Sequence, residues 1–410
     1  MTAGDNDGGE GKASRSSLII AVLFAVVAPI IPIVMIVASQ LSFGQVNDLP
    51  QYFAAGKLIV EGKGALVYSL RDLFAAEQHW FPSLGERGIG LFLAPCGLPF
   101  LVPVSFLPVS AAPAVWTLAL AGSLIGGLLV VRRLFGLSLT GMLWLFAVVS
   151  LCGPAYESLR IGQPAPFLFL ALAAALVAWR DGRTVVGSLF LAVLLLKPQE
   201  LLPFMIYAAG ARRYRGVLLV SGFGVILSLL AFLLIGPVGF ANYFQLLSDP
   251  SNLSLMQPEL NPTWRGQLLR LPGLPSSVAN LVGVFVVALT CVFLFALGRR
   301  MSGCKDWLEA GIIVSMPLGL VTALHCHIYD LLLMIPSLVA LTRSRLVAVL
   351  PSWLTLVGFA AMAPFLLPFY VNVQYNYLLK DGVVNPHFIV LALLSTFLSV
   401  LVWHRRQDFQ

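Results

Sequence analysis

Apolar runs of membrane length recur along almost the whole chain. About 20 apolar residues cross the hydrocarbon of a bilayer, so the sequence predicts roughly a dozen spans. The 410 residues are 59% hydrophobic and only 10% charged, whereas a soluble domain carries about a quarter charged residues. The chain is therefore predicted to be an all-α polytopic membrane protein. The predicted spans are 18–41, 89–107, 111–131, 138–155, 165–179, 184–209, 216–236, 277–298, 308–324, 327–342, 346–369 and 387–403.

The remaining residues divide into a tail and a few polar intervals. Residues 1–17 are rich in Gly, Ser and Asp and are predicted to be a disordered cytoplasmic tail. The run that follows is too long for a signal peptide and lacks an Ala-x-Ala site, so a retained helix is expected. Residues 18–410 are then one transmembrane domain. Its longer polar intervals are 43–88, 156–164, 237–275 and 371–386.

Basic residues predict the orientation of these spans. The net charge of +7 sits mostly in short Lys and Arg clusters at the ends of apolar runs, which argues for membrane topology and against nucleic acid. Placing these clusters in the cytoplasm sends 43–88 and 237–275, the two large polar loops, to the outer face. The clusters are Lys12 with Arg15, Arg212 with Arg213 and Arg215, Arg299 with Arg300 and Lys305, Arg343 with Arg345, and Arg405 with Arg406.

Two further arginine pairs conflict with simple alternation of full crossings. Both pairs become cytoplasmic if 89–110 and 184–209 are half-crossings that turn back, and such broken helices occur where they line a cavity. The first segment is rich in proline, and the second is interrupted at Lys197 and Pro198. The charge rule favours this second topology over twelve full crossings. The arginine pairs are Arg132 with Arg133 and Arg180 with Arg183.

Asp48 follows the first predicted span and is an ionisable group at the membrane surface. A charge held there is a functional candidate. The sequence Asp-Leu-Pro-Gln also fits a simple N-cap with proline behind it, and position alone favours neither interpretation. Amphipathic helices are expected at 51–61, which contains Tyr52, and at 70–80. Such helices lie in the membrane interface, and Leu73, Phe74 and Trp80 are expected to face lipid.

Two polar groups interrupt apolar sequence further along the chain. Glu157 and Arg160, at i and i+3, favour an intrahelical ion pair over a site. Gln163 lies between Gly162 and Pro164, where an uncharged hydrogen-bonding group suits a polyol. Lys197 lies deep among apolar residues and needs a counter-anion. That anion is either Glu200 or one supplied by a ligand such as phosphate, and both interpretations stay open.

Aromatic and imidazole groups mark the later outer segments. Trp264 beside Arg265 suits either a sugar platform or an interfacial anchor. His325 and His327 would lie about 200° apart on a helix, which is a poor geometry for a shared metal. One imidazole facing a cavity is expected to bind an anionic leaving group instead. The five isolated cysteines are expected to be small core residues and not disulfides or metal ligands. The absence of Gly-rich phosphate loops disfavours a soluble nucleotide-sugar enzyme.

Several short motifs, in order along the chain, resemble glycosyltransferase family 87, the polyprenyl-phosphate-mannose-dependent mannosyltransferases with the GT-C membrane fold. The likeness covers most of the chain. The motifs are Asn-Asp-Leu-Pro-Gln-Tyr-Phe at 47–53, the stretch 62–68 that ends in Val-Tyr, Gly-Gln at 162–163, Leu-Lys-Pro at 196–198, and His-Ile-Tyr at 327–329.

The resemblance implies a GT-C-type bundle and assigns roles to residues. Asp48 would be the general base that prepares an acceptor hydroxyl for inverting transfer, and Lys197 and His327 would bind the donor phosphate. Asp48 has Asn47 and Leu49 as neighbours where many GT-C enzymes carry paired acids, so no metal and no cofactor is expected. The implied substrate-binding residues are Tyr52, Gln163, Trp264, Arg265, His325 and Tyr329.

The resemblance also implies partners and a location. A polyprenyl-phosphate-linked sugar donor would place its tail in a groove of the bundle, and the acceptor would be a glycolipid or glycan. The site would lie on the periplasmic, extracytoplasmic face of the inner (plasma) membrane. Two alternatives remain: a transporter or flippase of a lipid-linked sugar, and a non-catalytic lipid-binding subunit. Paired interruptions in the two halves would favour transport, and the sequence displays one Lys-Pro break without a clear twin.

Overall fold

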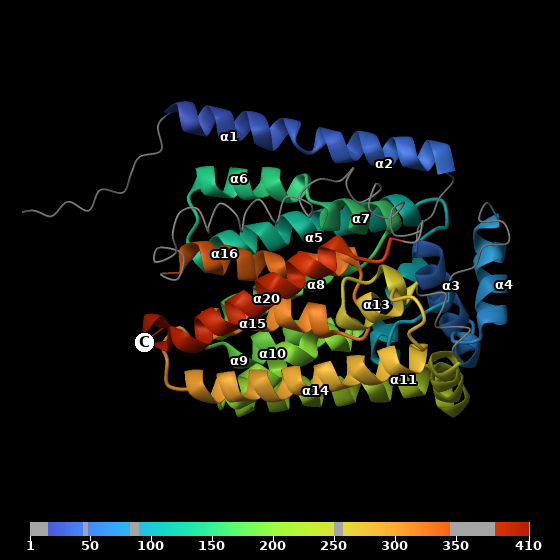
Figure 1. The fold of residues 1–410 in the computed structure, drawn as a ribbon. Helices are drawn as coiled ribbons and strands as arrows, with labels where there is room; N and C mark the ends of the chain where they lie inside the picture. The colour runs from blue at the N-terminus through green and yellow to red at the C-terminus, as the bar shows by residue number, and fades with distance from the viewer. Residues whose placement is uncertain (1–14, 44–47, 83–89, 250–256, 345–381, 410) are drawn as a thin grey trace, which may run out of the picture.

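The protein is built from helices that run nearly parallel to one another. The computed structural model describes residues 15–43, 48–82, 90–249, 257–344 and 382–409, and the regular elements in these ranges are α- and 3-10 helices (Figure 1). The predicted all-α class is therefore confirmed. The predicted span 346–369, most of the tail 1–17 and most of the interval 371–386 lie outside the described residues.

Five helical segments in the described part of the chain are long and apolar enough to cross a membrane. A sixth appears if α6 (Leu139–Ser150) and α7 (Gly153–Ile161), bent by 59°, form one span. The five segments are Ser16–Ile36, which combines α1 (Arg15–Val27) with the first half of α2 (Ile30–Phe43), then α5 (Ala112–Phe135), α11 (Tyr214–Ser248), α14 (Ser276–Met301) and α20 (Pro386–His404).

The other apolar runs form shorter helices, so the predicted count of about twelve spans is not confirmed. They are η3 (Pro95–Phe100) with η4 (Val102–Phe106), α8 (Ala165–Arg180), α9 (Thr184–Val193), α10 (Pro198–Gly210), α15 (Trp307–Thr322) and α16 (Ile335–Arg343). Large apolar side chains stay exposed on the long helices, for example Leu233 at 80% and Leu281 at 71%. Exposed apolar stripes of this length suit a helix whose solvent is lipid. The chain is a multi-pass membrane protein.

The segment 184–210 enters the bundle and returns to the end from which it came. Helix α9 is followed by a single 3-10 turn, η5 (Leu194–Leu196), and α10 then runs back. Near its entry, Ser188 donates to the carbonyl of Gly216 at 3.3 Å, and near its exit Tyr207 donates to the carbonyl of Trp307 at 2.6 Å. The structure therefore shows a hairpin in 184–210 with Lys197 at its tip, and its depth in the membrane stays a prediction.

A second hairpin of the same kind runs from α15 through η7 (Ile328–Met334) to α16. Ser337 of α16 donates to the carbonyl of Ile312 in α15 at 2.6 Å. The two helices therefore lie side by side, and the chain reverses direction between them. The Lys-Pro break at 197–198 thus has a counterpart at 325–330. The expectation of a break without a twin was wrong, because this second turn contains no proline to reveal it.

The proline-rich segment 95–106 reaches the tip of the first hairpin. Its 3-10 helices η3 and η4 contain Pro99 and Pro103, which favour short turns over a long helix. The Cys96 thiol donates to the carbonyl of Leu195 at 3.2 Å. The half-crossing at 89–110 stays a prediction.

The C-terminus lies at one end of the bundle (Figure 1), and the arginines that close α5, α8 and α14 lie at this end as well. Trp307 organises this end, since its ring lies 6.2 Å from that of Trp179 and 4.5 Å from Cζ of Arg213. The neighbouring Asp306 amide donates to the carbonyl of Phe409 at 3.1 Å. The two arginine pairs that conflicted with alternation lie at this same end. Arginines here are Arg132, Arg133, Arg180, Arg183, Arg213 and Arg300.

The opposite end carries α3 (Leu49–Val60), α4 (Leu70–Trp80) and α13 (Trp264–Leu269), as Figure 1 shows. Helix α11 breaks at Gly236, whose φ of 64° is left-handed, before Pro237; this break matches the predicted end of the span at 236. Helix α3 is buried on nearly every side, so the expected amphipathic surface helix is wrong there. In α4, Leu73 is also buried in the protein and does not face lipid.

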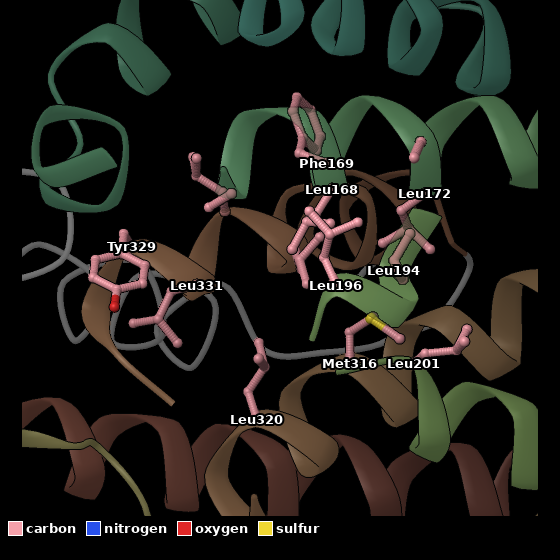
Figure 2. Packing of buried hydrophobic residues seen from close by; sticks show 14 of the residues in the cluster. Leu168, Phe169, Leu172, Leu194, Leu196, Leu201, Met316, Leu320, Tyr329 and Leu331 are labelled. Atoms are coloured by element: carbon pink, nitrogen blue, oxygen red, sulfur yellow. The ribbon is translucent and has the colours of Figure 1, made fainter. Parts of the chain in front are cut away.

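The core lies where the hairpins meet α8. Figure 2 shows Leu168 and Leu172 of α8 in one apolar cluster with Leu194 and Leu196 of the first hairpin turn. The same cluster holds Met316 and Leu320 of α15, and Tyr329 and Leu331 of η7 (Figure 2). Burying both hairpin tips in one cluster fixes their position relative to each other.

Helices α10 and α14 pack backbone against backbone, and this contact gives a stability prediction. A Cβ atom on Gly298 would lie within 3.0 Å of the backbone of Tyr207 and Ala211, so Gly298→Ala should destabilise the protein by about 1–3 kcal/mol through overpacking. Gly122→Ala is the control, because its Cβ would enter open space. Thermal unfolding in detergent measures both. An unchanged Gly298→Ala midpoint contradicts the prediction.

Candidate functional site

Asp48 lies at the start of α3, but its side chain does not cap that helix. The carboxylate accepts a hydrogen bond from Nε2 of Gln163 instead. The Asp48 amide donates to the carbonyl of Ile161 at 2.6 Å, which fixes the backbone against α7. Because the carboxylate is 9% exposed and turned toward α7, the simple N-cap interpretation is wrong.

The turn between α7 and α8 positions Gln163. Helix α7 ends at Gly162, whose φ of 75° is the left-handed conformation that favours glycine. Trp116 of α5 donates its indole N–H to the Gly162 carbonyl at 2.8 Å. Glu157 and Arg160 form the predicted intrahelical pair, with N–O distances of 2.7 and 3.1 Å. The turn is thus held from two sides, with Gln163 directed at Asp48.

Tyr52 connects Asp48 to the interior of the bundle. Its hydroxyl donates to Oε1 of Gln163 at 3.4 Å, and its ring lies 5.8 Å from that of Trp116. Burial raises the pKa of the Tyr52 hydroxyl well above its usual value, and the nearby carboxylates of Asp48 and Asp330 raise it further. Tyr52 therefore lies between the two carboxylates and stays neutral.

The environment of Asp48 changes its acidity. Burial raises the pKa of this carboxyl from 3.8 to about 6, while the hydrogen bond from Gln163 and the positive charges of Lys197 and Arg160 oppose the shift. Burial dominates because it removes water from the charged form. A carboxylate with a pKa near neutrality is well matched to accept a proton.

Lys197, at the tip of the first hairpin, is 9% exposed and surrounded by polar partners. Its ammonium forms an ion pair with Asp330 of the second hairpin. Glu200 lies 3.8 Å away, and the ammonium stands 4.4 Å over the ring of Tyr329. The sequence predicted Glu200 or a ligand as the counter-anion. The closer partner is Asp330, 133 positions away.

His325 and His327 lie side by side in the turn before η7. Their ring centroids are 4.6 Å apart, and the His327 ring is 5.1 Å from that of Tyr329. The expectation that 200° of helix separates them was wrong, because these residues are not helical. His327 also donates its backbone N–H to Asp330 at 2.9 Å. His327 and Lys197 therefore share Asp330 as a partner.

The second outer loop forms a wall beside these histidines. Fully buried Asn261 places Nδ2 at 3.1 Å from Nδ1 of His325. Arg265 donates to Oδ1 of Asn280 at 2.7 Å and to the carbonyl of Leu324 at 3.2 Å. Arg265 thereby supports the backbone next to His325.

Trp264 is the one proposed site residue whose observed contacts lie elsewhere. It is 41% exposed, and its ring packs edge to face on Phe388 of α20 at 5.0 Å. This contact favours the anchor interpretation over a sugar platform.

The site therefore brings together residues from five distant parts of the chain. Sequence reasoning missed Asp330 and Asn261. The available signal for Asp330 was a carboxylate inside an apolar run, three residues after His327. Within the described ranges no three His, Cys, Asp or Glu side chains are grouped so as to hold a metal ion.

A polytopic helical membrane protein with a buried polar cluster at one end is the class that this fold and site define. The profile of glycosyltransferase family 87 matches residues 94–324, more than half of the chain. The chain belongs to this family, and the resemblance noted in the sequence is confirmed.

A curated relative and the solved structures were also compared with the chain. A polyprenol-phosphate-mannose-dependent alpha-(1-2)-phosphatidylinositol pentamannoside mannosyltransferase from Mycolicibacterium smegmatis is 26% identical over 283 residues. The aligned region covers 65% of this chain and 65% of the relative, so the match spans slightly less than two thirds of the relative's length. No solved structure matches the chain.

The acidity of Asp48 can be measured without an activity assay. In infrared difference spectra of wild type minus Asp48→Asn, the protonated carboxyl band should appear as the pH falls through about 6. Gln163→Leu removes the hydrogen bond that stabilises the charged form, so this variant should move the transition to higher pH. A transition near pH 4 in both wild type and Gln163→Leu would contradict the conclusion that burial raises the pKa of Asp48.

Proposed function

We propose that this protein is a membrane mannosyltransferase. It moves mannose, with inversion, from a polyprenyl-phosphate donor to a hydroxyl of a glycolipid or glycan acceptor. The observation that carries the proposal is the placement of Asp48 near Lys197: hydrogen bonds join Asp48, Gln163 and Tyr52 in one buried group, and the Lys197 charge acts on the Asp48 carboxylate. Membership of the family supports glycosyl transfer, and the relative's name supports mannose and the lipid donor.

The donor phosphate binds between Lys197 and His327. The Lys197 ammonium supplies a positive charge, and the His327 ring is a hydrogen-bond donor within the same group of side chains. Phosphate is a good leaving group, so the cation mainly stabilises the charge that grows on it as the sugar departs. Tyr329 forms the wall between these two groups.

Asp48 deprotonates the acceptor hydroxyl on the other side of the sugar. One carboxylate is sufficient for a single inverting displacement, because the oxygen attacks the anomeric carbon opposite the departing phosphate. Gln163 orients Asp48 and keeps it separate from the cations. Arg265, His325 and Tyr52 line the approach for the acceptor or the sugar hydroxyls.

The donor tail lies in an apolar groove next to Lys197. This groove of about 620 Å³ runs between α10, α11 and the proline-rich segment. Leu195 and Pro198, which flank Lys197 on either side, belong to its lining. An apolar groove lined by the sequence neighbours of Lys197 suits an isoprenoid chain with a phosphate head. Other lining residues include Cys96, Leu201, Ser228 and Phe232.

The site end of the bundle faces the periplasm, away from the cytoplasm. The basic clusters gather at the opposite end, which the positive-inside rule assigns to the cytoplasm. In a bacterial cell this orientation places the site on the outer face of the inner (plasma) membrane.

A flippase for a lipid-linked sugar is the second candidate, because the two half-crossing hairpins with paired tips are a feature of transporters. A purified protein in vesicles with radiolabelled polyprenyl-phosphate-mannose distinguishes the two. Transfer yields a labelled acceptor, whereas flipping moves an unchanged donor across the membrane.

Asp48→Asn should lower the rate of transfer about a thousandfold, because it removes the general base. Donor binding should change little, since the phosphate is bound by Lys197 and His327. For wild type, kcat/KM should fall as the pH falls through about 6, when Asp48 becomes protonated.

Protein stability provides the control for Asp48→Asn. The folded-state pKa lies above the unfolded value, so the folded state binds more protons between these values and stability falls as pH rises through this window. The neutral amide avoids this loss, and the melting midpoint of Asp48→Asn at about pH 7.5 should equal or exceed that of wild type. Near-normal turnover of the folded variant would remove Asp48 from the role.

Ser228→Phe should weaken use of a long-chain donor by filling the groove. Ser228 is exposed on α11, so the change leaves the packing intact. The KM for a long polyprenyl donor should rise roughly three- to tenfold, and a short isoprenoid donor should be affected less. Leu233→Phe, on the same helix and 80% exposed, is the matched control. Equal effects of the two variants contradict this placement of the tail.

A further inference from the structure

Asp330 contacts the Lys197 ammonium and the backbone N–H of His327, and these two residues are the ones assigned to the donor phosphate. It is fully buried in η7. Oδ1 accepts from the Lys197 ammonium, and Oδ2 accepts from the backbone N–H of His327 at 2.9 Å. One carboxylate therefore joins the tip of the first hairpin to the turn that begins the second.

We propose that Asp330 is a positioning residue that holds Lys197 and His327 in register for the donor phosphate. The inference rests on the proposed function, since it concerns the same site. Asp330 acts through its two partners and does not itself touch the sugar.

The chemistry of the contacts requires a carboxylate at this position. The two donors approach different oxygens, and a carboxylate offers an acceptor to each. An amide of the same shape offers one acceptor and one N–H group, so either Lys197 or His327 loses its partner. A fully buried donor without an acceptor is unfavourable, and one of the two groups must shift.

The direction of that shift follows from Glu200. Its carboxylate lies 3.8 Å from the Lys197 ammonium and one turn along the same hairpin. When Asp330 no longer attracts the ammonium, Glu200 remains as its nearest acidic group, and the Lys197 ammonium moves toward it. The phosphate then loses the paired arrangement of ammonium and imidazole.

Glu200 is also the matched control, because it is a buried carboxylate beside the same ammonium without the contact to His327. Glu200→Gln leaves the Lys197–Asp330 pair and the His327 contact in place. Its effect on kcat/KM for the donor should therefore be small, although it removes a carboxyl group from the same cluster.

A double-mutant cycle with Lys197→Ala tests the inference in the full-length protein in nanodiscs. Asp330→Asn should lower kcat/KM for polyprenyl-phosphate-mannose about tenfold or more, mainly through a higher donor KM. In the Lys197→Ala background the same change should have less than about a threefold effect, because its principal target is gone. Glu200→Gln should also stay within about threefold of wild type.

A purely structural role gives a different result. Asp330→Asn would then lower the melting midpoint, and it would lower kcat/KM by the same factor with and without Lys197→Ala. That outcome overturns the inference. Wild-type kinetics for Asp330→Asn overturn it as well. If Asp330→Asn does not fold, Asp330→Glu retains the charge and both acceptors while displacing the ammonium. It should fold and still raise the donor KM; an unchanged KM counts against the inference.

Binding of undecaprenyl phosphate to the same variants separates this inference from the proposed function. Loss of affinity in Asp330→Asn, absent in Glu200→Gln, supports the positioning role even if wild type transfers no mannose. Absence of transfer by wild type would contradict only the proposed function. Equal affinity of wild type and Asp330→Asn would contradict only the positioning role.

Discussion

The ion pair between Lys197 and Asp330 is the interaction on which the rest of the site depends. Each residue lies at the turn of a hairpin, and each is a buried charge whose closest oppositely charged partner is the other. Breaking such a pair on one side is strongly unfavourable, so the two turns are kept together. Apolar packing of both turns against α8 buries the surrounding surface but does not specify which polar groups meet (Figure 2).

The second half of the site is organised without an ion pair. Asp48 has Gln163, an uncharged donor, as its hydrogen-bond partner, and neutral Tyr52 lies between it and the Lys197–Asp330 pair. A direct salt bridge would stabilise the charged carboxylate and lower its proton affinity. The amide instead fixes the orientation of Asp48 while burial raises its pKa to about 6. The site thus keeps the proton acceptor, Asp48, apart from the fixed positive charge of Lys197.

Sequence reasoning predicted the features that depend on local pattern. Runs of apolar residues located the long helices, and the placement of arginines predicted that 184–209 returns to the end from which it came, because charge placement reports on topology. It failed where partners are distant in sequence. Glu200 was considered for Lys197 because it is three residues away, whereas Asp330 is 133 positions away. His325 and His327 were placed on a helix that ends before them, since nothing in the apolar pattern marks that turn.

The half-crossings explain how a helical membrane protein can place polar groups where a continuous helix cannot. A helix that crosses completely satisfies its own backbone and directs most side chains to lipid or to neighbouring helices. A hairpin that turns inside the bundle exposes helix ends and turn residues there, and those positions hold Lys197, His327 and Asp330. Because the turns are enclosed by protein, their polar groups find partners in each other. The resulting cluster holds a fixed cation at the end of the bundle that carries α3 and α13.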